Sequence, residues 1–420
     1  MSVPAHPGRQ EARTAIEALR AGVPNRSAIR LLGSHEDGIA RGFAASLDRV
    51  WTAGREPGLL VAGDYGTGKS HMLGFMREQA LSRNFVVSWV TVSKETPLSQ
   101  PAALHAAALR GAMVAGRPED AVAVALADIV ARPGAVQALE EWATGAGLLP
   151  VFAAIAYLLG CDLPGELVQG IEAFLAGGKP PTQAVRARLA QLGARGVFNL
   201  AGLKAAQLQL ERPRFLAQLF RAAGFAGWLM LIDELELIGR YGAVQRATAY
   251  AELGRWLGLA PAEPVAGIVV AGAIADDFTR AVIDARLDDE KLPERLRLKG
   301  LPRQADLAAA ALQAIRRAPV LQRPGDAELQ RNAAIVQRCY AAAYGWNAPP
   351  ANILARESRR TMRHHIRGWI IDWDMQRLYG ASAGLAEAHE SYGYAEDATL
   401  GEPPEQLTWD EAPGEDGRAG

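Results

Sequence analysis

The octapeptide GDYGTGKS, from Gly63 to Ser70, combines residue types and a spacing that could bind phosphate. It fits the pattern G-x-x-x-x-G-K-[ST] without a mismatch. Glycines in such a loop let successive backbone N–H groups turn inward toward an anion. Lys69 would reach the β- and γ-phosphates, and the hydroxyl of Ser70 would bind Mg²⁺. The pattern predicts a site for ATP and Mg²⁺ formed by Gly63, Asp64, Tyr65, Gly66, Thr67, Gly68, Lys69, Ser70 and His71. A glycine turn that arose by chance is the alternative.

Two acids at the end of an apolar run could complete this site. The run 229–232 ends at Asp233 and Glu234. Because parallel strands bind ligands at their carboxyl ends, Asp233 could hold the Mg²⁺ ion there together with Ser70. Glu234 could orient and polarise the attacking water, which favours hydrolysis over binding alone. Lys69 and Glu234 are therefore the candidate catalytic residues, and two surface acids at a strand end are the alternative interpretation.

Hydrophobic periodicity predicts the elements that position these groups. An apolar run at 58–63 precedes the loop, a helical pattern at 70–83 follows it, and β-branched residues at 84–93 indicate a second strand. This βαβ unit has the size typical of a parallel sheet. Further strands are expected at 227–239, at 265–273 and, where apolar and polar residues alternate, at 295–302. The run 265–273 would carry the group that senses the γ-phosphate, for which Asp276 and Asp277 are the nearest candidates.

A long helical segment separates the loop from the acids. Lys69 and Asp233 are 164 residues apart, far more than two crossovers of a compact sheet require. About a hundred residues, near 105–215, are therefore expected to be inserted, and their alanine- and leucine-rich composition predicts helices. The insertion is either a decoration with its own small core or a domain that docks a partner.

The order of these elements resembles an AAA+ or related STAND-type ATPase. More narrowly, the stretches AIEALRAGVPN, GDYGTGKSHML, NFVVSWV, LIDELELI and RGWIIDWDMQRLYG resemble the ATP-binding proteins of BREX phage-defence systems, the BrxD-like group, over roughly residues 12–380. The resemblance implies an ATPase subunit of a bacterial anti-phage locus that works beside other defence-system proteins.

The expected fold class is α/β. It is a P-loop NTPase (AAA+-like) with a parallel sheet core, a large helical insertion and a C-terminal helical lid. The expected boundaries are 1–57 for an N-terminal helical lead, 58–302 for the ATPase core with its insertion, 303–382 for the lid with a basic helix, and 383–420 for an acidic, disordered tail.

Some arginines could act on a neighbouring subunit. In a ring or filament, an arginine supplied in trans can stabilise the charge that develops on the γ-phosphate. Arg286 and Arg295 are the preferred candidates, and Arg246, Arg280 and Arg297 are further candidates. Acids and bases alternate around them, so surface ion pairing is the alternative.

A predicted helix at 357–380 carries a basic stripe. Arginines recur every three or four residues on one face, a spacing that suits repeated contacts with a phosphate backbone. The opposite face is apolar and predicts burial. An ion-paired face, engaged with the acidic tail or the nucleotide, is the alternative. The candidate nucleic-acid contacts are Arg356, Arg359, Arg360, Arg363 and Arg367.

Charge and composition limit the class of protein. Residues 383–420 carry ten acids and one base, and the rest of the chain is mildly basic. A solvated, disordered tail is expected, and a tail that screens the basic body is the alternative. No run of eighteen apolar residues occurs and the first residues lack an apolar signal core, so we expect a cytoplasmic protein without a membrane partner.

The sequence thus predicts a cytoplasmic ATPase of an anti-phage defence system, which couples Mg·ATP to a conformational change or assembly step on DNA. It would work as a homo-oligomer or in a hetero-complex. Two alternatives stay open: an AAA+ loader or initiator for replication or transposition, and a non-enzymatic, ATP-gated scaffold that recruits partner proteins. No residue pattern supports a nuclease, methyltransferase or protease.

Overall fold

The computed structural model describes residues 8–22, 25–117, 120–351, 361–381, 393–397 and 400. Its centre is a parallel sheet of four strands in the order β1-β4-β3-β2. Each strand is almost wholly apolar, as expected where helices cover both faces of a parallel sheet. The strands are β1 (Leu59–Gly63), β2 (Val86–Thr91), β3 (Trp228–Asp233) and β4 (Ile268–Ala275). The protein is therefore mixed α/β, consistent with a P-loop-like fold.

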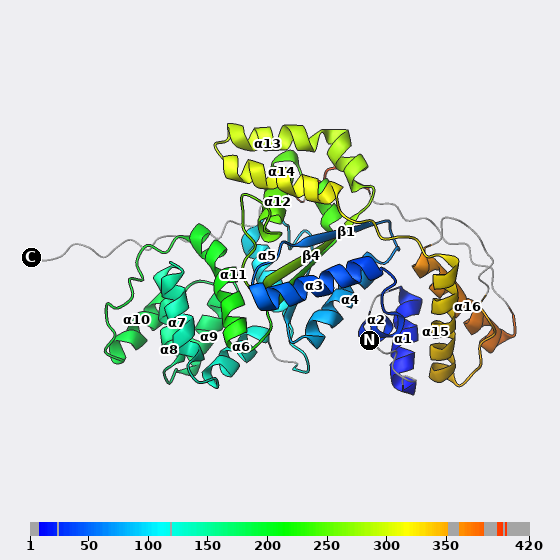
Figure 1. Cartoon of the computed structure of the whole chain (residues 1–420), viewed down its shortest axis with the longest axis horizontal. Coiled ribbons are helices and arrows are strands. Elements are labelled where there is room, and N and C mark those ends of the chain that lie inside the picture. The colour runs from blue at the N-terminus through cyan, green and yellow to red at the C-terminus, as the bar shows by residue number, and fades with distance from the viewer. Residues whose placement is uncertain are drawn as a thin grey trace, which may run out of the picture.

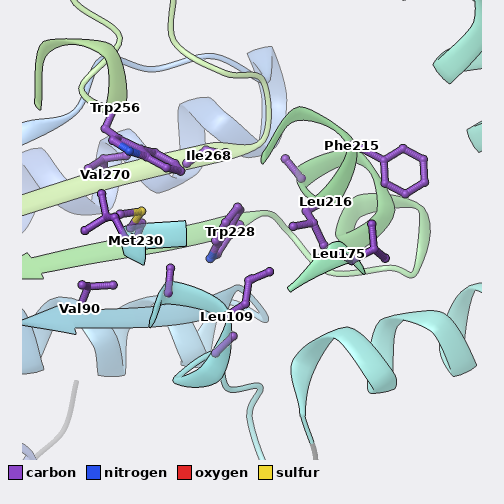
Figure 2. Packing of buried hydrophobic residues seen from close by; sticks show 14 of the residues in the cluster. Val90, Leu109, Leu175, Phe215, Leu216, Trp228, Met230, Trp256, Ile268 and Val270 are labelled. Carbon is purple, nitrogen blue, oxygen red and sulfur yellow. The ribbon is translucent and has the colours of Figure 1, made fainter. Parts of the chain in front are cut away.

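Alternate residues of the strands face two different cores. On one face, Val61, Leu229 and Leu231 pack with α3 (Asp37–Ala53) and α4 (Lys69–Ser82). On the other face, Trp228 lies fully buried, donates a hydrogen bond from its indole to Ser88 Oγ at 2.8 Å, and packs edge-on against Trp256. Figure 2 shows this second core running from Trp228 into the inserted helices.

The chain returns beside β1 at 319–321, outside the four named strands. Ala62 N donates to Pro319 O at 2.9 Å, and Leu321 N donates to Ala62 O at 2.8 Å, which is a parallel bridge of one residue. This segment extends the sheet beyond β1. The strand predicted at 295–302 is wrong, because those residues end α13 (Asp288–Leu298), turn at Gly300 and begin α14 (Pro302–Arg316).

The reason for that error lies in the charges of α13. Its first turn carries three acids and its last turn two arginines, a distribution that suits the helix dipole. Leu292 and Leu296, four residues apart, are buried, whereas Leu298 is 82% exposed. The spacing of Leu296 and Leu298 therefore fitted the two-residue period of a strand, although only Leu296 is buried. Helices α13 and α14 pack together over α12 (Ala243–Trp256) (Figure 1).

Seven helices lie between β2 and β3 in the described part of this interval. Their core contains Phe152, with ring centroids 5.6 Å from Phe174 and 5.1 Å from Phe215. This core is continuous with one face of the sheet, so the insertion rests firmly on the domain that carries the loop. The helices are α5 (Pro101–Arg110), α6 (Ala121–Val130), α7 (Ala135–Gly145), α8 (Pro150–Leu159), α9 (Gly165–Leu175), α10 (Thr182–Gln191) and α11 (Ala205–Ala222).

His105 of α5 makes the insertion sensitive to acid. It is buried, its Nε2 lies 2.9 Å from Leu175 O, and burial lowers its pKa to about 4. An unfolded histidine titrates near 6.5, so protons bind the unfolded chain first, and stability present above that pH is lost as the pH falls toward 4. At pH 4.5 this single group should cost about 2 kcal/mol of stability.

The variant His105→Gln keeps a side-chain donor but does not titrate. We therefore expect its midpoint of thermal unfolding to fall less between pH 7 and pH 4.5 than that of the parent. Both proteins would be followed by circular dichroism at several pH values. Equal falls in the two proteins would show that His105 does not control the acid response.

Helices from both ends of the sequence form a third core. In the first helix Ala12 and Ile16 are fully buried, and Gly22 caps the C-terminal end of the helix. They pack with Tyr340, Trp369 and Trp373 near the C-terminus. The helices are α1 (Arg9–Ala21), α2 (Arg26–Leu32), α15 (Asp326–Tyr344) and α16 (Met362–Tyr379), grouped beside α4 in Figure 1.

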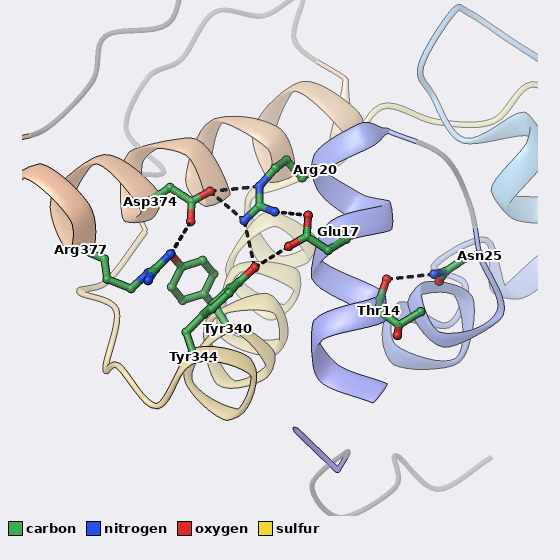
Figure 3. A network of polar contacts seen from close by, with 8 residues as sticks. All are labelled: Thr14, Glu17, Arg20, Asn25, Tyr340, Tyr344, Asp374 and Arg377. Carbon is green, nitrogen blue, oxygen red and sulfur yellow. Dashed lines mark hydrogen bonds and ion pairs between the residues drawn. The ribbon is translucent and has the colours of Figure 1, made fainter. Parts of the chain in front are cut away.

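A polar network fixes α1 to the two C-terminal helices (Figure 3). Arg20 of α1 donates to Asp374 of α16 at 3.0 Å and to the hydroxyl of Tyr344 of α15 at 3.1 Å. Tyr340 donates to the other oxygen of Asp374 at 2.6 Å, and Tyr344 donates to Glu17 at 2.7 Å. These contacts hold α1, α15 and α16 together as one unit.

Across the described ranges, no single helix is long and apolar enough to span a membrane. Helices α6 and α7 reach that length only together, and the chain bends by 111° between them.

Candidate nucleotide site

The loop Gly63–Ser70 links β1 to α4, the strand-loop-helix context that the pattern requires. Gly66 and Gly68 have φ angles of +78° and +107°, which side chains other than glycine rarely adopt. Thr67 closes the turn, since its N–H and its hydroxyl both donate to Asp64 O, at 3.2 and 2.8 Å. The backbone thus turns where the sequence predicts a phosphate-binding loop.

Gly66 is also required by packing. A Cβ at Gly66 would lie 2.7 Å from Thr361 Oγ1, closer than real contacts allow. Thr361 is the N-cap of α16 and shares a capping box with His364. The loop therefore touches the first turn of the last described helix, about three hundred residues further along the chain.

Asp233 and Ser70, which the sequence predicts as ligands of one metal ion, lie close together at the loop. Asp233 ends β3, is 6% exposed and accepts a hydrogen bond from the N–H of Glu234 at 3.0 Å. Burial raises the pKa of this carboxyl, while the nearby hydroxyl of Ser70 opposes the rise. Carboxylate and hydroxyl oxygens are the ligands that Mg²⁺ prefers. The side chains of Asp233 and Ser70 therefore fit a Mg²⁺ ion.

Glu234 has a strained backbone. Its φ and ψ are 60° and 35°, the left-handed region, at the start of the 3-10 helix η1 (Leu235–Arg240). A residue with a Cβ pays about 1–2 kcal/mol for this conformation. Strain of this kind gathers at functional sites, where the surrounding structure imposes it. Here the strain turns the chain sharply after β3 and places Glu234, half-buried, next to Asp233.

Lys69 is buried in the loop, and its ammonium lies close to two acceptors of the protein. Its Nζ donates to Gly63 O at 3.0 Å and lies 3.5 Å from Glu236 Oε1. Glu236, in η1, is 1% exposed. The sequence patterns did not single out Glu236, although a second acid stands two residues after Glu234.

A pocket opens beside the loop between the lead and the lid helices. His71 reaches from α4 to Gly33 O, with 2.7 Å between Nε2 and the oxygen, and burial lowers its pKa, so the neutral ring donates. The apolar side chains of Met72 and Ile366 line the same pocket. A partly apolar pocket with a few polar groups suits a nucleoside. The lining is Ala18, Leu19, Gly22, Ala28, Leu32, Gly33, Ser34, His35, Glu36, Gly66, Thr67, Gly68, Ser70, His71, Met72, Leu321, Glu328, Arg331, Asn332, Met362, Arg363 and Ile366.

The structure places Arg363 at this pocket rather than on an open basic face. Its guanidinium lies 5.1 Å from the ring centroid of Tyr65 and donates to the Tyr65 hydroxyl at 3.3 Å. Arg323 also reaches the loop, with a 3.0 Å ion pair to Asp64. No local pattern reveals contacts over such separations. Arg367 is half-buried, and the other three predicted nucleic-acid contacts, Arg356, Arg359 and Arg360, lie outside the described residues.

Part of the acidic tail is bound to the body, so for residues 393–397 and 400 the expectation of a disordered tail is wrong. The hydroxyl of Tyr394 donates to Asp277 Oδ1 at 2.7 Å, beside the end of β4. Asp397 pairs with Arg240 at 2.8 Å, and Glu396 pairs with Arg246 at 2.8 Å. The attraction between tail acids and arginines of the body explains the attachment. The composition of the tail alone did not indicate it, but the basic charge of the rest of the chain did.

The predicted trans arginines have different surroundings. Arg286 donates to Gly239 O at 2.8 Å and to Tyr394 O, and it lies 3.5 Å from Glu396. In this conformation Arg286 therefore stabilises its own chain. Arg246 is buried in a bidentate pair with Asp288. Arg295 is exposed on α13, and its action on a neighbour stays a prediction.

Comparison with known proteins supports an ATP-binding role for the loop Gly63–Ser70. Residues 8–134 match the sequence model of a family described as BREX system ATP-binding protein BrxC/D. The match confirms the resemblance of this part of the chain to a BrxC/D-like BREX protein, and it contains the whole loop. It ends before β3, so Asp233 and Glu234 are assigned from sequence and geometry. The comparisons found no match among curated proteins and none among solved structures.

Proposed function

We propose that this chain binds ATP with Mg²⁺ and hydrolyses it on a P-loop NTPase core of the AAA+ type. The observation that carries the proposal is the proximity of the Ser70 hydroxyl to the carboxyl of Asp233, where the hydroxyl opposes the rise of the carboxyl's pKa. The two side chains bring the N-terminus of α4 to the end of β3 although β4 lies between β1 and β3 in the sheet. Residues from two distant segments thus converge on one point at the phosphate-binding loop.

Each residue has a separate task in the proposed reaction. The N–H groups of the loop and the ammonium of Lys69 bind the phosphates, helped by the positive end of α4. Ser70 and Asp233 would hold Mg²⁺, which supplies charge neutralisation for the phosphate oxygens. Glu234 orients the attacking water and accepts its proton. The lining of the pocket beside the loop holds the nucleoside and excludes water from it.

The biological role that we propose is in anti-phage defence, from the match to the BREX family. The chain would work in the cytoplasm with other proteins of such a system, as a homo-oligomer or hetero-complex. In this proposal the ATP cycle is coupled to DNA through the nucleic-acid contacts predicted from the sequence at Arg356, Arg359 and Arg360.

The test compares ATP turnover of the parent and of Lys69→Ala, each with and without duplex DNA, together with the size of the assembly. Loss of the ammonium should weaken ATP binding about 100-fold, because charge-assisted contacts to phosphate are the strongest in such a loop. Arg49→Ala, which removes an exposed ion pair with Glu56 at the end of α3, is the matched control. Equal ATP binding by Lys69→Ala and the parent would contradict the proposal.

A second candidate, an ATP-gated scaffold without turnover, is favoured by one observation. Asp277, a candidate γ-phosphate sensor, already accepts a hydrogen bond from Tyr394. ATP binding without measurable hydrolysis in the experiment above would support this scaffold over the enzyme.

A further inference from the structure

Glu236 is a buried carboxylate within reach of Lys69 that the proposed reaction does not use. Its side chain is fully buried, and neither carboxylate oxygen has a hydrogen-bond partner among the described residues. The ammonium of Lys69 lies 3.5 Å from one of these oxygens. A buried acid with a purely structural role normally has its oxygens hydrogen-bonded. The missing hydrogen bonds suggest that this carboxylate serves the lysine rather than the fold.

The triphosphate and Glu236 require the same ammonium. Lys69 already divides its donors between Gly63 O and the carboxylate side. Phosphates bound in the loop would draw the ammonium toward themselves and away from Glu236. The same phosphates would also lie close to the negative charge of Glu236. The site holds little water, so the repulsion between these like charges is poorly screened.

We propose that Glu236 is a positioning residue that competes with the phosphates for Lys69 and thereby weakens ATP and ADP binding. This inference rests on the proposed function of the loop and adds a control of nucleotide affinity to it. A weaker grip lets the product leave, and product release limits the turnover of many enzymes. Glu234 remains the residue that activates water.

The experiment measures equilibrium binding of ATP, ADP and adenosine to the full chain and to Glu236→Gln. Removing the charge at nearly constant shape should tighten ATP and ADP binding about tenfold, the size expected for one pair of like charges in a shielded site. Adenosine, which has no phosphate, should bind equally to both proteins. A merely structural role for Glu236 predicts weaker or unchanged ATP binding.

Two further variants separate charge from folding. Glu236→Asp keeps the charge and should bind ATP within about threefold of the parent. Glu236→Leu removes the charge with an apolar side chain and should tighten binding as the glutamine does, which covers a failure of Glu236→Gln to fold. Unchanged or weaker ATP binding in folded, uncharged variants would overturn the inference.

The hydrolysis rate distinguishes Glu236 from a catalytic base. Single-turnover hydrolysis by Glu236→Gln should stay within about threefold of the parent, because Glu234 is present. A collapse of that rate would assign the base to Glu236 and overturn the positioning role. A parent chain that binds no ATP would overturn the proposed function instead.

Discussion

Glu234→Gln should lower the rate of ATP hydrolysis in a single turnover by about 100-fold or more, because a general base contributes 10²–10⁴-fold. The amide can still lie beside the water but cannot accept its proton. ATP binding should remain, since the phosphates are held by the loop and Lys69. The measurement is rapid-quench hydrolysis of radiolabelled ATP with enzyme in excess, together with a separate binding titration.

The matched control for this change is Glu252→Gln. Glu252 lies on α12 and pairs with Arg255 three residues away, so its loss should leave the rate unchanged. Hydrolysis by Glu234→Gln at the parent rate would contradict the base assignment. Loss of ATP binding by this variant would show instead that Glu234 shapes the loop.

Asp233→Asn should abolish the dependence of hydrolysis on Mg²⁺ and lower the Mg²⁺-supported rate about 100-fold, because the ion would lose its one anionic protein ligand. At the same time the variant should be more stable than the parent at neutral pH without nucleotide. Burial raises the pKa of Asp233. The folded protein thus favours the protonated form, and stability is lost as the pH rises from the unfolded pKa to the raised folded pKa.

Two measurements check this pair of effects. Thermal unfolding without nucleotide should show a higher midpoint for Asp233→Asn than for the parent. The additional stabilisation that Mg²⁺ brings to the ATP-bound parent should be missing in the variant. Asp306→Asn, in an exposed pair with Arg297, is the control for both. An ATP-bound variant that still responds to Mg²⁺ would show that the ion is held elsewhere.

Local patterns predicted the part of the site that lies on regular elements. The loop between β1 and α4 has its own spacing signal, and an apolar strand that ends in two acids is readable as β3. Each of these two patterns needed only residues within a few positions of one another. The proximity of Ser70 and Asp233 is expected instead from the rule that ligands bind at the carboxyl ends of parallel strands.

Contacts between distant segments could not be predicted in the same way. Arg363 reaches Tyr65 across 298 positions and Tyr394 reaches Asp277 across 117, and neither pair has a shared pattern in the sequence. The segment 295–302 failed for another reason, since its alternation fits a strand while its end charges suit a helix. In that segment, the end charges and the burial of Leu292 and Leu296 favour the helix α13 over a strand.

The core shared by α1, α15 and α16 affects the chain during its synthesis. Ala12 and Ile16 emerge from the ribosome early, but their packing partners on α15 begin at Leu329. At about 5–20 residues per second, roughly 15 to 60 seconds pass before that helix is available. Throughout this interval the apolar stripe of α1 remains a target for chaperones. A truncated mRNA that ends before α15 would therefore yield an aggregation-prone polypeptide rather than a smaller functional protein.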